Sequence, residues 1–69
     1  MSHYRVGGVE TIDYIEAKCS TEEFKGFCKA NILKYVSRAG YKMSETAFSD
    51  LKKAKYYIDK WIEIEQTSE

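Results

Sequence analysis

The fold of this 69-residue chain is decided by residues 20–40, which read STEEFKGFCKANILKYVSRAG. Ser20 and Glu23 have the spacing of a capping box, in which each side chain accepts a hydrogen bond from the backbone N–H of the other residue. Apolar residues then recur at intervals of three and four, which indicates one buried helix face. Gly40 suits the left-handed conformation that ends many helices. The stretch therefore predicts a helix over residues 21–39.

Residues after Gly40 predict a partner for this helix. Ser44 is a candidate N-cap, and apolar residues recur at the helical period from Ala47 to Ile62. We therefore expect a helix over residues 45–64 and a frayed tail over residues 65–69. Because the connection is short, the two helices are expected to pack as an antiparallel hairpin.

Residues before the capping box predict a short helix and an arm. Apolar side chains recur at helical spacing over residues 10–19, which indicates a short helix. Residues 1–9 contain a Gly-Gly pair and are expected to form an extended arm that ends in a turn. The chain is thus predicted to be one all-α domain. Because so short a chain buries only a modest core, we expect it to assemble as a homo-oligomer.

Composition excludes several classes of function. The chain has two cysteines and a single histidine, so the usual zinc-ligand spacings are absent, and we expect no metal and no resident cofactor. No apolar run approaches the length needed to span a bilayer, and no signal peptide is recognisable. We therefore expect a cytoplasmic protein, without membrane contact, whose thiols are reduced. There is no glycine-rich phosphate loop and no Ser/His/Asp set.

Positive charge is concentrated in one segment of a neutral chain. The chain has 11 basic and 11 acidic residues, yet residues 24–43 hold five basic residues and no acidic one. Lys34 and Arg38 are four apart and share a helix face, and Lys42 follows shortly afterwards. These cations either complement the negative end of the helix dipole or form a phosphate clamp in which Arg38 is a bidentate donor. The balanced total charge argues against general DNA binding.

Two polar residues are candidates for ordering such a site. Asn31 is expected at the edge of the buried face, where its amide makes a structural hydrogen bond or recognises a base or ribose. Asp50 lies on the core-facing side of its helix and is expected to reach Lys34 or Arg38. Its role is then that of an ion-pair partner, of a group that orients a cation toward a ligand, or, least favoured, of a catalytic carboxylate.

Three stretches are distinctive in their order and spacing: HYRVGGVETIDYIE at residues 3–16, NILKYVSRAGYK at 31–42 and DLKKAKYY at 50–57. Together they resemble a small domain that is common in bacteriophages, belongs to a family of unknown function and is often labelled nucleotide kinase. The label derives from a longer phage protein that phosphorylates nucleoside monophosphates without a phosphate loop, and this chain is little more than the bare domain. The resemblance implies nucleotide binding. It maps the family pattern onto His3, Tyr4, Gly7, Gly8, Asn31, Lys34, Tyr35, Arg38, Gly40, Lys42, Asp50, Leu51, Ala54 and Tyr57.

The sequence and the resemblance together predict a phage protein that binds a nucleotide, or a cyclic or oligonucleotide ligand, in a basic pocket between subunits. Lys34, Arg38 and Lys42 are expected to hold phosphate. The arm is expected to add His3, Tyr4 and Arg5, and a base is expected to stack on Tyr35, Tyr4 or Tyr57. No catalytic residue is identified.

Three uses of such a protein remain open. In the first, the protein sequesters a nucleotide second messenger of host anti-phage defence in the host cytoplasm. Alternatively, it is a nucleoside monophosphate kinase that uses Mg²⁺, or a protein-interaction module that inhibits a host protein. Turnover of the ligand distinguishes the first two uses, because a kinase releases a changed product.

Overall fold

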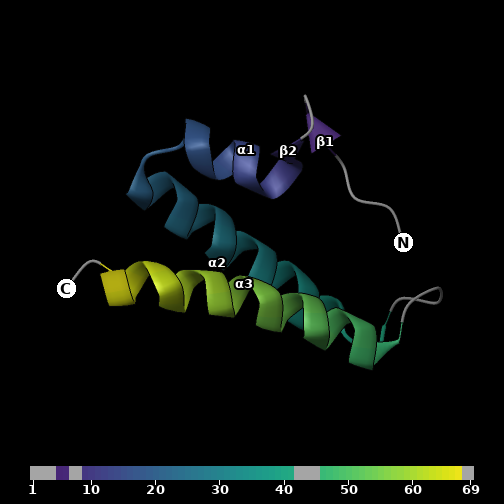
Figure 1. Cartoon of the computed structure of the whole chain (residues 1–69). Helices are drawn as coiled ribbons and strands as arrows, with labels where there is room; N and C mark the ends of the chain where they lie inside the picture. Colours follow the sequence, from purple (N-terminus) through teal and green to yellow (C-terminus); the bar gives the residue numbers. More distant parts are fainter. Residues whose placement is uncertain (1–4, 7–8, 42–45, 68–69) are drawn as a thin grey trace.

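The structure is a computed structural model that describes residues 5–6, 9–41 and 46–67, and it consists mainly of three helices (Figure 1). Figure 1 shows α2 and α3 side by side along most of their length, with α1 following the two short strands. The elements in chain order are β1 Arg5–Val6, β2 Val9–Glu10, α1 Thr11–Lys18, α2 Thr21–Arg38 and α3 Ala47–Thr67. The helical fold class is therefore as the sequence predicts.

Local signals fix both ends of α2. The Ser20 backbone N–H donates to Glu23 Oε1 over 2.8 Å, and the Glu23 N–H donates to Ser20 Oγ over 3.1 Å, so both bonds of the capping box form. The helix ends at Arg38, one residue before the predicted end. Gly40 has a φ of 84°, in the left-handed region, and the Tyr41 N–H donates to the Arg38 carbonyl.

The bounds of α3 differ from the prediction at both ends. Thr46 Oγ1 accepts a hydrogen bond from the Ser49 N–H, so Thr46 makes the cap bond, whereas Ser44 lies outside the described residues. The helix continues to Thr67, so the expected fraying of residues 65–67 is wrong. The reason is a set of side-chain bonds: Glu65 binds both Lys25 of α2 and the Trp61 indole. The spacing of apolar residues in the sequence does not reveal that polar side chains hold the end of this helix.

The N-terminal part adds a feature that an all-α prediction did not include. The strands β1 and β2 pair antiparallel, with Arg5 opposite Glu10 and Val6 opposite Val9. Both strands contact α1, which contains no fully buried residue. Glu16 of α1 lies 3.9 Å from Lys60 Nζ of α3, so α1 is tied to the end of the hairpin where α2 begins.

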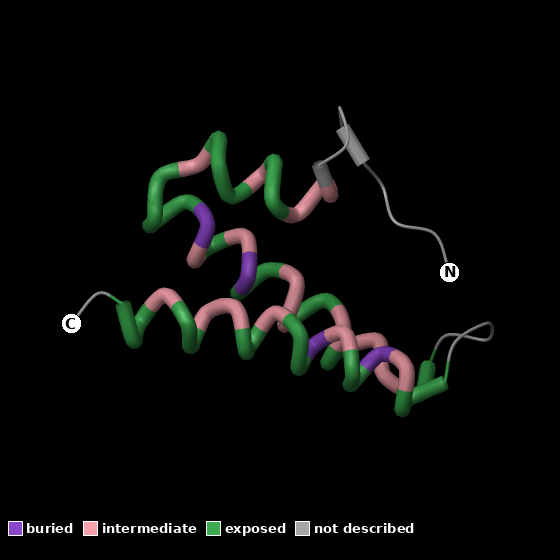
Figure 2. Tube along the Cα trace, in the orientation of Figure 1, coloured by how far each residue is buried: buried purple, intermediate pink, exposed green. Residues whose placement is uncertain are grey.

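The core is small and lies along the contact between α2 and α3 (Figure 2). Its buried apolar residues among those described are Phe24, Cys28 and Ala54, and the carboxylate of Asp50 is buried with them. Cys28 and Cys19 are free thiols. Burial raises the pKa of the Cys28 thiol, and the nearby Glu16 carboxylate adds to this.

Much apolar surface remains exposed around this core. Large apolar side chains that stay at least 40% exposed occur on all three helices. Within the described residues, none of the helices combines the length and hydropathy required to cross a bilayer. The hairpin therefore has two long faces whose side chains are exposed to solvent. One face is basic and aromatic, and the other is apolar.

Candidate functional site

A buried ion pair anchors the basic end of the hairpin. Arg38 Nε and Nη2 both donate to Asp50 Oδ1, over 3.1 and 2.9 Å. The Asp50 side chain is fully buried, whereas that of Arg38 is 28% exposed. Asp50 Oδ2 is buried and has no hydrogen-bond partner. The pair joins α2 to α3 and fixes the guanidinium at the surface, so the expected contact of Asp50 with one of the two cations forms with Arg38.

Three cations surround the ring of Tyr35. Lys34 Nζ lies 4.6 Å, Arg38 Cζ 5.0 Å and Lys53 Nζ 5.5 Å from the ring centroid. These distances are within the range of cation–π attraction. Asp50 is paired with Arg38 within this group, so the group combines three cations with one carboxylate. We call Lys34, Tyr35, Arg38, Asp50 and Lys53 the basic cluster.

An aromatic stack supports the basic cluster from inside the hairpin. The rings of Tyr35 and Tyr57 are nearly parallel, with an interplanar angle of 9° and centroids 6.1 Å apart. Tyr57 also meets Phe27 and Tyr56 edge-on, at 5.8 and 5.2 Å. Burial raises the pKa of the Tyr57 phenol, and the neighbouring Tyr35 and Tyr56 add to this. Tyr57 therefore stabilises the contact between the helices, and its faces are engaged by other rings.

An open hollow adjoins the cluster on α3. It has a volume of about 380 Å³ and is lined by Phe48, Ser49, Lys52, Lys53 and Tyr56. Phe48 is 70% exposed, and Lys52 Nζ lies 5.3 Å from the centroid of its ring. Lys53 belongs to both the hollow and the basic cluster. The arrangement places exposed aromatic faces next to several ammonium groups, which is the chemistry that a phosphorylated aromatic ligand requires.

The structure brings together half of the residues that the sequence nominated. Lys34, Tyr35, Arg38, Asp50 and Tyr57 lie in or directly behind the basic cluster.

The other nominated residues stand apart from the cluster or lie outside the description. Asn31 Nδ2 donates to the Phe27 carbonyl of its own helix over 2.9 Å, which is a structural bond. Arg5 belongs to β1, whose contacts are with β2 and α1, and its side chain lies outside the described part. His3, Tyr4 and Lys42 also lie outside the described residues.

The sequence did not nominate the residues of α3 that complete the site. Lys53 lies three residues after Asp50 and four before Tyr57, so all three share a helix face, and this spacing was the available signal. Phe48, Lys52 and Tyr56 recur at every fourth residue and line the same hollow. The apolar pattern predicted Phe48 on the core-facing side of its helix, whereas the structure leaves it 70% exposed. Lys52 and Tyr56 were expected to face away from the core.

Fold and site together define a small helical-hairpin protein with a basic and aromatic cluster near its turn. A family model described as a protein of unknown function, DUF3310, matches residues 1–59, and the chain belongs to this family. The resemblance carried by the three sequence stretches is thereby confirmed.

Two curated phage proteins are similar to this chain. It is 48% identical over 59 residues to "Nucleotide kinase gp1.7" of Escherichia phage T7, across 81% of this chain and 30% of that protein. It is 45% identical over 58 residues to "Gene 1.7 protein" of Enterobacteria phage T3, across 81% of this chain and 36% of that protein. The chain therefore spans about a third of the length of these relatives. No solved structure matches it.

Proposed function

We propose that this protein binds a nucleotide or a nucleotide-derived phosphate ligand at the basic cluster and the adjoining hollow. The observation that carries the proposal is the convergence of Lys34, Arg38 and Lys53 on one ring, beside exposed aromatic faces. The name of the T7 relative, a nucleotide kinase, agrees with this ligand class. Phosphate oxygens are the natural partners of clustered ammonium and guanidinium groups.

Different residues of the site would contact the phosphate and the base. Lys34 and Lys53 supply charge to the phosphate, and the buried Asp50 orients Arg38 toward it. The base stacks in the hollow, on Phe48 or Tyr56, because Tyr57 is already engaged by three rings. A hollow of about 380 Å³ is within the usual range for small-molecule pockets. Lys42, His3, Tyr4 and Arg5 remain proposed contributors to phosphate binding.

We further propose that the ligand is held between copies and is not converted. The basic cluster and its hollow form an open surface on one chain, so a second copy would supply the wall that encloses the ligand. Binding would then sequester the ligand, and a nucleotide second messenger of host defence belongs to the proposed class. The kinase alternative is favoured by the name of the T7 relative and requires turnover. Incubation with ATP and a nucleoside monophosphate, followed by chromatography of the recovered nucleotides, distinguishes holding from conversion.

Calorimetry with ATP and with a cyclic dinucleotide as probes tests the site. Lys34→Glu should weaken binding of the probe that binds by at least tenfold, because it replaces attraction to phosphate by repulsion. The matched control is Lys29→Glu, an exposed lysine of the same helix. A separation of five residues rotates it by about 140° from Lys34. We expect the control to retain the affinity of the unmodified protein within about twofold.

Phe48→Ala tests the position of the base. It should weaken nucleotide binding by about 1–3 kcal/mol while leaving inorganic pyrophosphate binding unchanged, since pyrophosphate has no base to stack. Equal losses in Lys34→Glu and Lys29→Glu would show that the phosphate site lies elsewhere. Absence of binding by both probes would refute the nucleotide proposal.

A further inference from the structure

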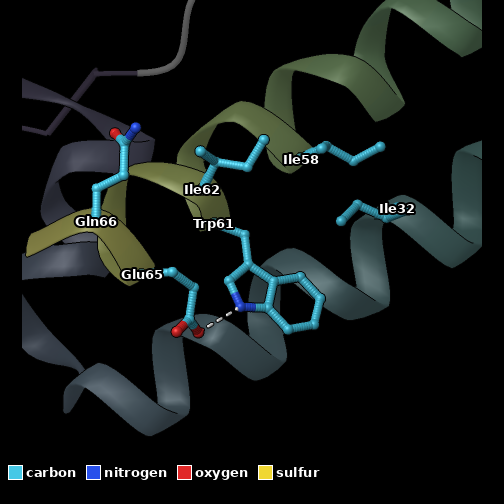
Figure 3. Close-up of a pocket in the computed structure, with 6 residues that line it drawn as sticks. All are labelled: Ile32, Ile58, Trp61, Ile62, Glu65 and Gln66. Carbon is cyan, nitrogen blue, oxygen red and sulfur yellow. Dashed lines mark hydrogen bonds between the residues drawn. The ribbon is translucent and has the colours of Figure 1, made fainter. Parts of the chain in front are cut away.

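The face of the hairpin that carries Ile32 and Ile58 is apolar and hollowed. Figure 3 shows the side chains of these two residues extending toward each other from α2 and α3, beside Trp61 and Ile62. The hollow has a volume of about 530 Å³. Ile58 and Ile62 are 40% and 48% exposed. Within the described residues, this is an apolar depression without a covering element.

The same face carries protruding apolar side chains beside the hollow. Val36 lies four residues after Ile32 on α2, and Leu51 lies seven residues before Ile58 on α3, so each shares a helix face with its hollow residue. Each is 50% exposed. Because the helices are antiparallel, both protrusions are displaced from the hollow toward the hairpin turn, by about 6 and 10 Å at 1.5 Å per residue. We call Ile32, Val36, Leu51, Ile58, Trp61 and Ile62 the apolar face.

The charges that border the apolar face are paired with each other. Lys25 Nζ lies 3.0 Å from Glu65 Oε2 and 3.5 Å from Glu22 Oε2, and the same Glu65 oxygen accepts the Trp61 indole N–H. The Lys25 ammonium holds the pKa of Glu65 below its usual range, and the indole bond adds to this. One lysine is shared by two carboxylates, so these three groups carry a formal charge of −1, which is a small obstacle to contact with a second copy.

We infer that the apolar face is an interface for a second copy of this chain. A two-fold axis across the face would place Val36 and Leu51 of each copy on the hollow of the other, which satisfies the self-complementarity of an isologous contact. The helix α3 is about 30 Å long and two packed helices are about 20 Å across, so the face covers about 600 Å² per copy. The total of about 1,200 Å² is at the lower end of the range for stable, specific interfaces. The product is a four-helix bundle, a common solution for hairpins of this kind. The contact forms without nucleotide and is independent of the proposed ligand.

Trp61 provides a local probe of this interface, because it is the only tryptophan of the chain and lines the hollow. Sedimentation velocity and tryptophan emission of the full chain should be measured over the same range of protein concentrations. We expect a transition from one copy to two that coincides with a blue shift of the emission, as the partner excludes water from the indole. The transition should occur without any nucleotide.

Two variants with the same change of charge locate the contact. Ile62→Glu, on the apolar face, should weaken dimerisation by at least tenfold and keep the emission at its monomer wavelength. Ala30→Glu, at an exposed position of α2 about 160° around the helix from Ile32, should leave both measurements within about twofold of the unmodified protein. Circular dichroism verifies that both variants fold, and Ile58→Glu replaces Ile62→Glu if the latter does not.

Three results would overturn the inference. The first is a chain that stays monomeric at every concentration, which would leave the face to a partner of another kind or to another segment of this chain. The second is a dimer whose tryptophan emission does not shift, which would place the contact elsewhere. The third is an Ile62→Glu variant that dimerises like the unmodified protein.

Discussion

The two faces of the α2–α3 hairpin are built from the same helices and differ in how their side chains are held. In the basic cluster, a buried carboxylate and a ring fix the cations, so the charge is organised before any ligand arrives. On the apolar face, half-exposed aliphatic side chains surround a hollow and make few specific bonds. The difference lies in the chemistry of the exposed groups, which are aliphatic on one face and include cations around an aromatic ring on the other. The apolar face is suited to self-association and the basic cluster to an anion.

Breaking the buried ion pair should have the largest effect on the molecule. Arg38→Ala leaves the Asp50 carboxylate buried without a counter-charge, which costs about 3–5 kcal/mol in comparable cases. A domain of this size has about 3–10 kcal/mol of stability in total. Urea denaturation followed by circular dichroism should therefore show a chain that is largely or wholly unfolded. Arg38→Glu is unsuited to a binding test for the same reason, since it places two carboxylates together.

A double variant is the control for this prediction. Arg38→Met combined with Asp50→Leu removes both charges and fills the space with apolar groups, a replacement that is often neutral or stabilising. The double variant should fold and dimerise through the apolar face, yet bind nucleotide more weakly than the unmodified protein. If Arg38→Ala alone is as stable as the unmodified protein, the ion pair does not stabilise the contact between α2 and α3.

The sequence predicted the hairpin well because its signals were local. The capping box at Ser20 and Glu23 and the left-handed Gly40 both act within a few residues, and both appear as expected. The end of α3 was predicted too early because it depends on Lys25, which is 40 residues from Glu65 in the chain. A contact between distant residues requires knowledge of the packing that the periodicity of a single helix does not contain.

The candidate site was predictable only in part, for a related reason. The spacing of Lys34 and Arg38 showed that they share a helix face, and the core-facing position of Asp50 indicated an ion pair across the hairpin. The convergence of Lys53 on Tyr35 depends on how α3 is rotated against α2. A role for exposed aromatic residues of α3, such as Phe48, becomes apparent only from the hollow that they line together with the lysines.

Salt should weaken binding at the basic cluster and leave the apolar face almost unaffected. Raising NaCl from about 50 to 500 mM should weaken nucleotide binding to the basic cluster by about tenfold, because ions screen charge and compete for phosphate. Dimerisation through the apolar face should stay within about twofold, because its contacts are mainly apolar and the bordering Lys25 is already paired with Glu65. Calorimetry and sedimentation at matched salt concentrations measure the two effects. Parallel weakening of both would indicate that a single surface carries both interactions.

Tyr57 allows the smallest and most local test, because its ring supports the basic cluster from within the hairpin. Burial raises the pKa of its phenol above the ordinary value of 10. Folding therefore favours the protonated form, and the stability that this contributes is complete below pH 10 and is lost as the pH rises toward the higher pKa of the folded state. Tyr57→Phe keeps the ring stack and removes the ionisable group, so this loss of stability in alkali should become smaller.

Phenolate absorbance during an alkaline titration measures the effect directly. The unmodified protein should show a late phase that coincides with unfolding, and this phase should be absent in Tyr57→Phe. The matched control is Tyr41→Phe, since Tyr41 is 86% exposed, and it should retain the late phase. If the late phase disappears in Tyr41→Phe and persists in Tyr57→Phe, the aromatic stack does not bury Tyr57 in solution. The support that this stack gives the basic cluster would then be lost, while the apolar face would keep its role, because the two faces share no side chain.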